Sequence, residues 1–277
     1  MIIQTISSGD GITFTQDGSD VSISSESRFT SSTCDMPTMS NNSVDSANDI
    51  DFTEGFCHDL STKAKISCSA MTKQLDAVFA EGTEAGGLDT GEKASDTWYH
   101  CFAISKENGT TDFLFSTSAD NPTMPESFVN KRRIGSIKTD SYGNIKSFYQ
   151  VGNLFSYNPH TELNGNASVP NWTLLTLPTV PTGIEVFPLL NIILAAGLTS
   201  SASSIGFNFK HPESNVLMGR KYAACQSSIN NGCTNTQSLV NTVLTNSSAQ
   251  IHYKTSSSGN FSYNVSCDGY IDKRGAK

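Results

Sequence analysis

The sequence predicts a mainly β protein with two antiparallel modules of β-sandwich or jelly-roll type, one packed α-helix at residues 69–81, and an extended N-terminal arm. Composition is the first observation behind this prediction. Of the 277 residues, 36% are hydrophobic and 16% are charged, and polar small residues make up the difference from an average soluble domain. The second observation is that apolar and polar residues alternate over short runs bounded by Ser, Asn and Gly, as in half-buried strands.

Residues 1–35 are expected to form the arm. Residues 2–25 alternate loosely and turn at Gly9–Gly11 and Asp17–Ser19. A hairpin of this size cannot hold a core of its own. It therefore either attaches to a neighbouring protein or adds a strand pair to the main sheet. Residues 26–48 are rich in Ser, Thr, Asn and Asp and should form a surface connection.

The first module is predicted over residues 36–160. Near its start, Asp49, Asp51 and Glu54 alternate with apolar residues. Clustered carboxylates can hold calcium, but no loop of calcium-binding spacing surrounds these three, so a solvated strand face is the favoured interpretation.

The helix is predicted from an apolar stripe at three- and four-residue steps. The stripe consists of Met71, Leu75, Val78 and Phe79, and the residues expected to face outward are Lys73, Gln74, Asp76 and Ala77. Gly82 follows in the position of a left-handed cap.

A β-hairpin follows the helix. Its strands are expected at residues 98–104 and 112–116, with the turn at Asn108–Gly109. A third strand at 134–137 is entered through Lys131, Arg132 and Arg133, and this short basic run is interpreted as a solvated edge that discourages strand addition.

The second module is predicted over residues 161–277, with the boundary placed within a segment, residues 158–171, that contains Pro159, Gly165 and Pro170. Clean alternation at 205–209, 251–255 and 261–265 is typical of an antiparallel sandwich or jelly roll. The most apolar stretch, residues 187–198, is too short to span a bilayer and is expected to be a buried strand.

Charge and cysteine content limit the possible partners. With 18 basic and 26 acidic residues the formal net charge is −8, which argues against nucleic acid as a partner. No secretory signal or membrane segment is recognised, so synthesis and folding in the cytosol are expected.

The seven cysteines show no metal or redox spacing. Cys225 and Cys233 could be joined across a short loop, but reducing conditions favour buried free thiols.

The sequence predicts no catalytic, cofactor or metal site. The candidate carboxylates for glycoside cleavage are Asp76, Asp89, Asp112, Glu185 and Asp272, and nothing in the sequence brings two of them together. For Asp272, a structural ion pair with an arginine is the simpler interpretation. Neighbours such as Cys57–His58 and His100–Cys101 point to opposite faces of a strand. His100 is expected on the core side, beside Trp98 and Phe102.

Several motifs occur in a recognisable order from residue 36 to the C-terminus. They are GGLDTG at 86–91, WYH at 98–100, LFSTSA at 114–119, NPTMP at 121–125, KRRIGSI at 131–137, VPTGI at 180–184 and GYIDKRG at 269–275. This series closely resembles a module of tailed-bacteriophage and prophage structural proteins, described as tail fibre or tail-associated proteins. Residues 1–33 lie outside the resemblance.

The resemblance implies a non-enzymatic subunit of a phage virion, made in the bacterial cytoplasm and located at the tail. Its expected partners are other virion proteins and further copies of itself, with a trimer as one arrangement. Attachment to a host surface glycan would use exposed loops such as 92–97 and 256–260. The alternatives are a capsid fibre or decoration protein, a polysaccharide depolymerase, and a carbohydrate-binding module.

Overall fold

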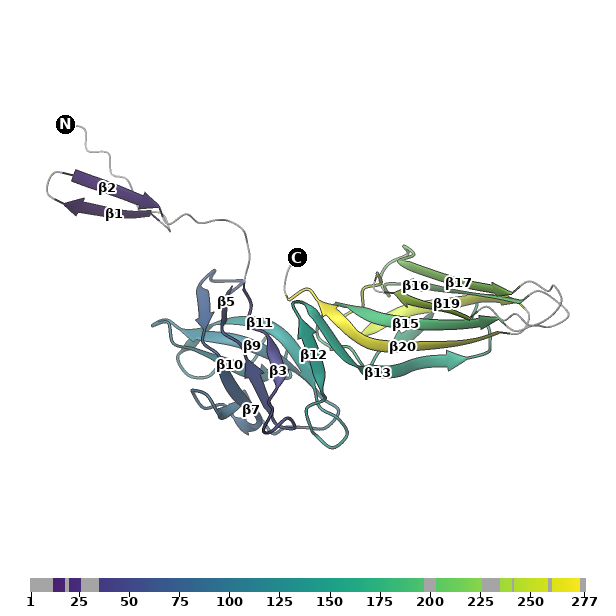
Figure 1. The fold of residues 1–277 in the computed structure, drawn as a ribbon, viewed down its shortest axis with the longest axis horizontal. Coiled ribbons are helices and arrows are strands. Elements are labelled where there is room, and N and C mark those ends of the chain that lie inside the picture. Colours follow the sequence, from purple (N-terminus) through teal and green to yellow (C-terminus); the bar gives the residue numbers. More distant parts are fainter. Residues whose placement is uncertain are drawn as a thin grey trace. The chain divides into compact units, whose positions relative to one another are not determined.

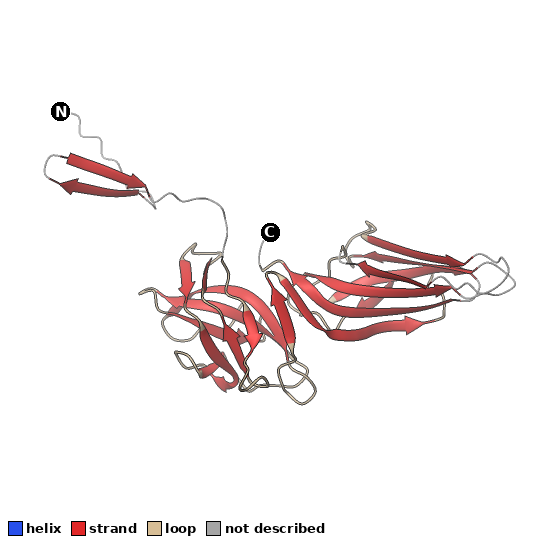
Figure 2. Cartoon of the chain, in the orientation of Figure 1, coloured by secondary structure: helices blue, strands red, loops and turns tan. Residues whose placement is uncertain are grey.

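The computed structural model describes residues 12–17, 20–25, 35–196, 203–225, 235–240, 242–258 and 261–274. The chain divides into two units, residues 1–35 and 36–277. In the first unit, β1 (Ile12–Asp17) and β2 (Asp20–Ser25) pair as an antiparallel hairpin. The protein is mainly β, and Figure 2 shows strands and loops throughout the part of the chain that is described.

Within the described residues, the second unit holds three sheets and a small hairpin of β5 (Gly55–His58) and β6 (Lys65–Cys68). Sheet 1 has the order β11–β9–β10–β8–β7–β4–β3, with strands β3 (Met39–Asn41), β4 (Asp49–Phe52), β7 (Met71–Val78), β8 (Ala85–Leu88), β9 (Trp98–Lys106), β10 (Thr111–Ser116) and β11 (Phe128–Lys138). Sheet 2 has the order β12–β13–β20–β15–β18, with strands β12 (Phe148–Val151), β13 (Leu154–Gly165), β15 (Val186–Ala196), β18 (Asn235–Val240) and β20 (Phe261–Asp272). Sheet 3 has the order β14–β19–β16–β17, with strands β14 (Thr173–Thr176), β16 (Ser203–Lys210), β17 (Gly219–Cys225) and β19 (Gln250–Ser258).

The predicted hairpin around Asn108–Gly109 is confirmed. Strands β9 and β10 pair antiparallel on either side of this turn, and β11 adds to the other edge of β9 as the predicted third strand. The strand predicted in the apolar stretch is also present, as β15.

The predicted helix at residues 69–81 is wrong, because this segment contains strand β7. Alternation along β7 turns Lys73 inward, where it is 0% exposed, and leaves Val78 61% exposed. The ammonium group of Lys73 lies 3.1 Å from a carboxylate oxygen of Asp112 on β10 and donates to the carbonyls of Ala80 and Gly82. Burial of a lysine is tolerable only with such partners, and the local sequence pattern gives no sign of them.

Sheet 1 is strongly curled, as in a half-barrel. Phe52 of β4 and Phe113 of β10 stack with ring centroids 4.0 Å apart, although their strands are not neighbours in the sheet. At the two edges of the sheet, the side chain of Met39 on β3 lies against Gly135 on β11. The concave face therefore encloses a core of its own.

Sheets 2 and 3 contact each other through alternating apolar side chains. Phe207 of β16 meets Tyr263 of β20 edge to face, with centroids 4.9 Å apart. Ile205, Phe207 and Phe209 are all buried, as the alternation predicted. Figure 1 shows β13, β15 and β20 running side by side. The module boundary expected between residues 160 and 161 falls inside β13, which spans Leu154–Gly165.

An aromatic cluster joins sheet 1 to sheet 2. The indole of Trp98 on β9 packs edge to face against Tyr157 of β13 and Tyr270 of β20. The Tyr270 hydroxyl donates to the carbonyl of Ser136 on β11 at 2.8 Å. We call this contact region the junction.

The cysteines and the apolar segments were the subject of two expectations drawn from the sequence. Cys68, Cys101 and Cys267 are buried thiols, as predicted, whereas the side chains of Cys225 and Cys233 lie outside the described residues. In the ranges that the structure describes, we find no helix with the length and apolar character of a membrane span.

Candidate functional site

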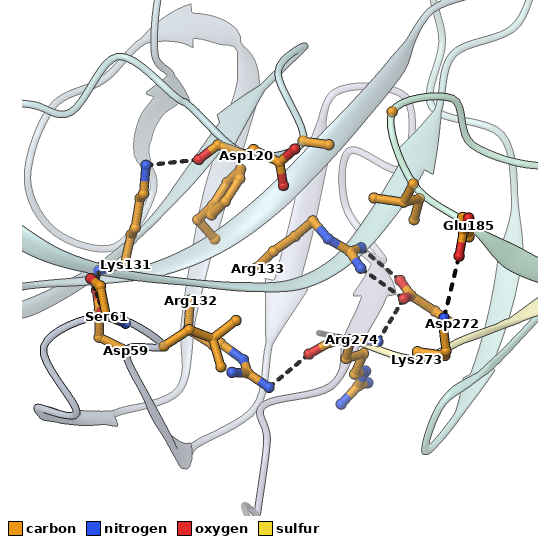
Figure 3. Close-up of a pocket in the computed structure, with 15 residues that line it drawn as sticks. Asp59, Ser61, Asp120, Lys131, Arg132, Arg133, Glu185, Asp272, Lys273 and Arg274 are labelled. Atoms are coloured by element: carbon orange, nitrogen blue, oxygen red, sulfur yellow. Dashed lines mark hydrogen bonds and ion pairs between the residues drawn. The ribbon is translucent and has the colours of Figure 1, made fainter. Parts of the chain in front are cut away.

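A cavity of about 500 Å³ lies at the junction, between β11 and the C-terminal end of β20 (Figure 3). Five of its lining residues are basic, and they come from only two segments. These are Lys131, Arg132 and Arg133 on β11, and Lys273 and Arg274 after β20. The two segments belong to motifs far apart in the sequence, and the contact between β11 of sheet 1 and β20 of sheet 2 brings them together.

Arg133 and Asp272 form a bidentate ion pair along one wall. Both guanidinium–carboxylate distances are 2.7 Å, and Figure 3 shows the two side chains pointing at each other. Burial alone would raise the pKa of Asp272, but the Arg133 guanidinium holds it below its usual range. The ion pair predicted for Asp272 is confirmed. The interpretation of the basic run as a solvated edge is wrong for Arg133, because its side chain turns into the junction.

Arg132 and Arg274 form the second basic pair, and both donate to backbone carbonyls. Arg132 Nη2 donates to the Arg274 carbonyl at 2.7 Å, and Arg274 Nη2 donates to the carbonyl of Gly152 at 2.8 Å. Arg274 is only 4% exposed. In the described part of the chain, the Nε atoms of both arginines are buried and have no hydrogen-bond partner. Burial lowers the pKa of Arg274, attraction to Asp272 opposes this effect, and repulsion from Arg133 and Arg132 adds to it.

Two acidic residues of the lining, Asp59 and Glu185, have partners within the protein. Asp59 accepts hydrogen bonds from the backbone N–H groups of Lys131, Ser61 and Thr62. Burial would raise the pKa of Asp59, but these bonds lower it to about 2. At the rim, Lys273 lies 3.5 Å from a carboxylate oxygen of Glu185. The cavity therefore presents cationic groups whose charge is only partly balanced from within.

A Ser–His contact lies behind the cavity wall but lacks the setting of a catalytic pair. The Nδ1 atom of His100 is 2.9 Å from the Ser136 hydroxyl, and both residues are buried. Burial, with a further contribution from Arg133, lowers the pKa of His100 to about 4. The imidazole is thus neutral near pH 7 and sealed from substrate, in agreement with the core position predicted for it.

The structure does not gather the candidate carboxylates into a hydrolytic pair. Glu185 and Asp272 both line the cavity, but Asp272 is bound to a guanidinium. Asp112 is in an internal ion pair, Asp89 accepts backbone N–H groups, and Asp76 is exposed on β7. Sequence reasoning missed Arg132 and Arg274 as site residues, although the basic character of KRRIGSI and IDKRG was a signal for them.

The acidic strand face near the start of the module behaves differently from the cavity. Asp49 on β4 is half-buried, and burial together with repulsion from Asp45, Asp76 and Asp51 raises its pKa to about 6. Among the residues that the structure describes, no group of His, Cys, Asp and Glu has the geometry to hold a metal ion.

Asp49→Asn is expected to stabilise the protein at pH 7 by ~1 kcal/mol, a value discounted for partial exposure. Because folding raises this pKa, the folded state binds the proton more tightly, so wild-type stability should fall as pH rises from about 4 to about 6. Urea unfolding across this pH range measures the effect. Parallel pH profiles for the variant and the wild type would contradict it.

The fold and the cavity define this chain as a mainly β protein with an arginine-rich cavity at a junction between sheets. A scan against protein-family models finds no match to the sequence, and a search of the curated proteins finds no significant relative.

Proposed function

We propose that this chain is a non-enzymatic structural subunit of a tailed-phage virion, namely a tail fibre or tail-associated protein that acts through assembly and attachment. The observation that carries the proposal is where the motifs of the phage-like series lie in the fold. WYH supplies Trp98 and His100, KRRIGSI supplies Arg133, and GYIDKRG supplies Tyr270 and Asp272. All of them belong to the junction or its ion pair.

This placement favours a structural role for the sequence motifs that carry the resemblance. Residues that hold two sheets together have to recur wherever the same architecture recurs, whatever surface the protein presents. A resemblance that includes three motifs of the junction therefore supports a common architecture. At the finer level, we propose that sheets 2 and 3 form the β-sandwich expected for the C-terminal module, since their inner faces interdigitate.

Attachment and assembly would use surfaces away from the junction. The loop at 92–97 is exposed along most of its length, and the N–H of Asp96 donates to the carbonyl of Asp140 in the neighbouring turn. That turn carries Tyr142, which is 88% exposed and could stack on a sugar ring of a host surface glycan. Residues 259–260 of the other expected loop are outside the described ranges. Homo-oligomerisation, for example as a trimer, would cover exposed strand edges.

Immunogold electron microscopy of intact particles, with antibody raised against the purified chain, tests the proposal. We expect gold at the tail, and no gold on particles from a phage in which the gene is deleted. Gold on the capsid surface would replace the tail assignment by a capsid fibre or decoration protein, and unlabelled particles would overturn the virion proposal. Release of reducing sugar from host polysaccharide by the purified chain would instead favour a depolymerase.

A further inference from the structure

We propose that the cavity at the junction binds a small ligand through an oxyanion, held between the guanidinium groups of Arg132 and Arg274. This assignment goes beyond the role in a virion and does not depend on it. The ligand class is a sugar-sized molecule that carries a carboxylate or a phosphate.

The charged side chains around the cavity are unevenly paired. Arg133 has a carboxylate partner in Asp272, and Lys273 has one in Glu185. Arg132 and Arg274 are bonded to carbonyl oxygens instead, and among the described residues neither guanidinium has an ion-pair partner of its own. Two arginines held close together repel each other, and an anion between them would remove that repulsion.

Both arginines also have hydrogen-bond donors that are unused in the described structure. The Nε atoms of Arg132 and Arg274 are buried and have no hydrogen-bond partner within the described ranges. Leaving a buried donor unsatisfied is unfavourable, because the donor has lost its bonds to water. Guanidinium groups present N–H pairs in a planar fork that matches the two oxygens of a carboxylate or phosphate. An oxyanion is thus the ligand group that these two side chains lack.

The rest of the cavity lining suits the remainder of such a ligand. A volume of about 500 Å³ lies in the range of small-molecule sites. Leu60 and Ile184 contribute apolar contact for the carbon skeleton of a ligand, and the exposed carboxylates of Asp120 and Glu185 can accept hydrogen bonds from hydroxyl groups. A polyhydroxylated acid can bind both the arginine pair and the rest of the lining. A neutral sugar leaves the two guanidinium groups without an anionic partner.

Calorimetric titration of the purified full chain with glucuronate, glucose 6-phosphate and glucose tests the assignment. We expect the acid, the phosphate ester or both to bind, with glucose at least tenfold weaker, since a charge-assisted bond is lost. The tighter-binding anion shows whether the site prefers a carboxylate or a phosphate. Equal binding of all three ligands, or binding of none, would overturn the proposal.

Variants localise the binding to the arginine pair. Arg132→Gln should weaken binding by about tenfold or more, and Arg132→Lys should restore part of it because a lysine supplies charge without the fork. Lys146→Gln, which removes the same charge away from the cavity, should leave binding unchanged. Arg274→Gln should act like Arg132→Gln, provided that circular dichroism shows it folded. Unchanged affinity in folded Arg132→Gln would refute the assignment.

Discussion

Arg133→Met is expected to lower the free energy of unfolding by about 3–5 kcal/mol, because it leaves the carboxylate of Asp272 buried without its guanidinium. The side chain of Asp272 is 1% exposed and receives two bonds of 2.7 Å from Arg133. Its remaining bond in the described structure, from the backbone N–H of Arg274, cannot neutralise the charge. Urea unfolding followed by tryptophan fluorescence, to which Trp98 in the same junction contributes, measures the loss.

The contribution of the ion pair to stability should depend on pH. Folding lowers the pKa of Asp272, so the ion pair stabilises the protein at pH values above the unfolded pKa of about 3.9, and this stabilisation is lost as pH falls through the folded pKa. The difference between the wild type and Arg133→Met should therefore be largest near neutral pH and should shrink in acid. A matched double variant, Arg133→Met with Asp272→Leu, should recover part of the loss, since it leaves no unpaired charge. A loss below 1 kcal/mol in the single variant would show that the pair is dispensable.

Gly269→Ala is expected to cost about 3–5 kcal/mol, from backbone strain and overpacking together. Gly269 has φ of +141°, and an added Cβ would lie 2.0 Å from the carbonyl oxygen of Phe155 on the neighbouring strand. The obstacle is backbone, so it cannot rotate away. Relief would require β13 and β20 to separate beside the stacked rings of Phe155 and Tyr270.

Gly109→Ala is the matched control for this substitution. Gly109 also has positive φ, at +89°, but no atom lies within 4 Å of an added Cβ. The control therefore carries only the left-handed strain, of about 1–2 kcal/mol. Thermal unfolding of both variants separates the two contributions, and equal losses would show that the close approach to Phe155 relaxes freely.

The hairpin of residues 98–116 and segment 69–81 show why one prediction from sequence was confirmed and the other was wrong. In the hairpin, strand periodicity and turn chemistry are both local, and they agree. In segment 69–81, helical spacing is present, but the backbone of β7 pairs with β4 and β8, which lie elsewhere in the chain. The backbone hydrogen bonds of β7 to its neighbouring strands, together with the ion pair of Lys73 with Asp112 on β10, stabilise the strand more than the helical spacing of apolar residues stabilises a helix.

The local pattern was enough to predict the β class, the alternation along β16, β19 and β20 and the turn at Asn108–Gly109, because each depends on residues close together in the chain. The tertiary structure was needed to show that Lys73 is buried, that the motifs at residues 98, 133 and 270 meet in one junction, and that Arg132 lies beside Arg274. These arrangements arise from strand pairing and from contact between sheets, which bring together segments distant in the chain. Periodicity records which side of a strand is apolar, but it carries no information about which other strand that side will meet.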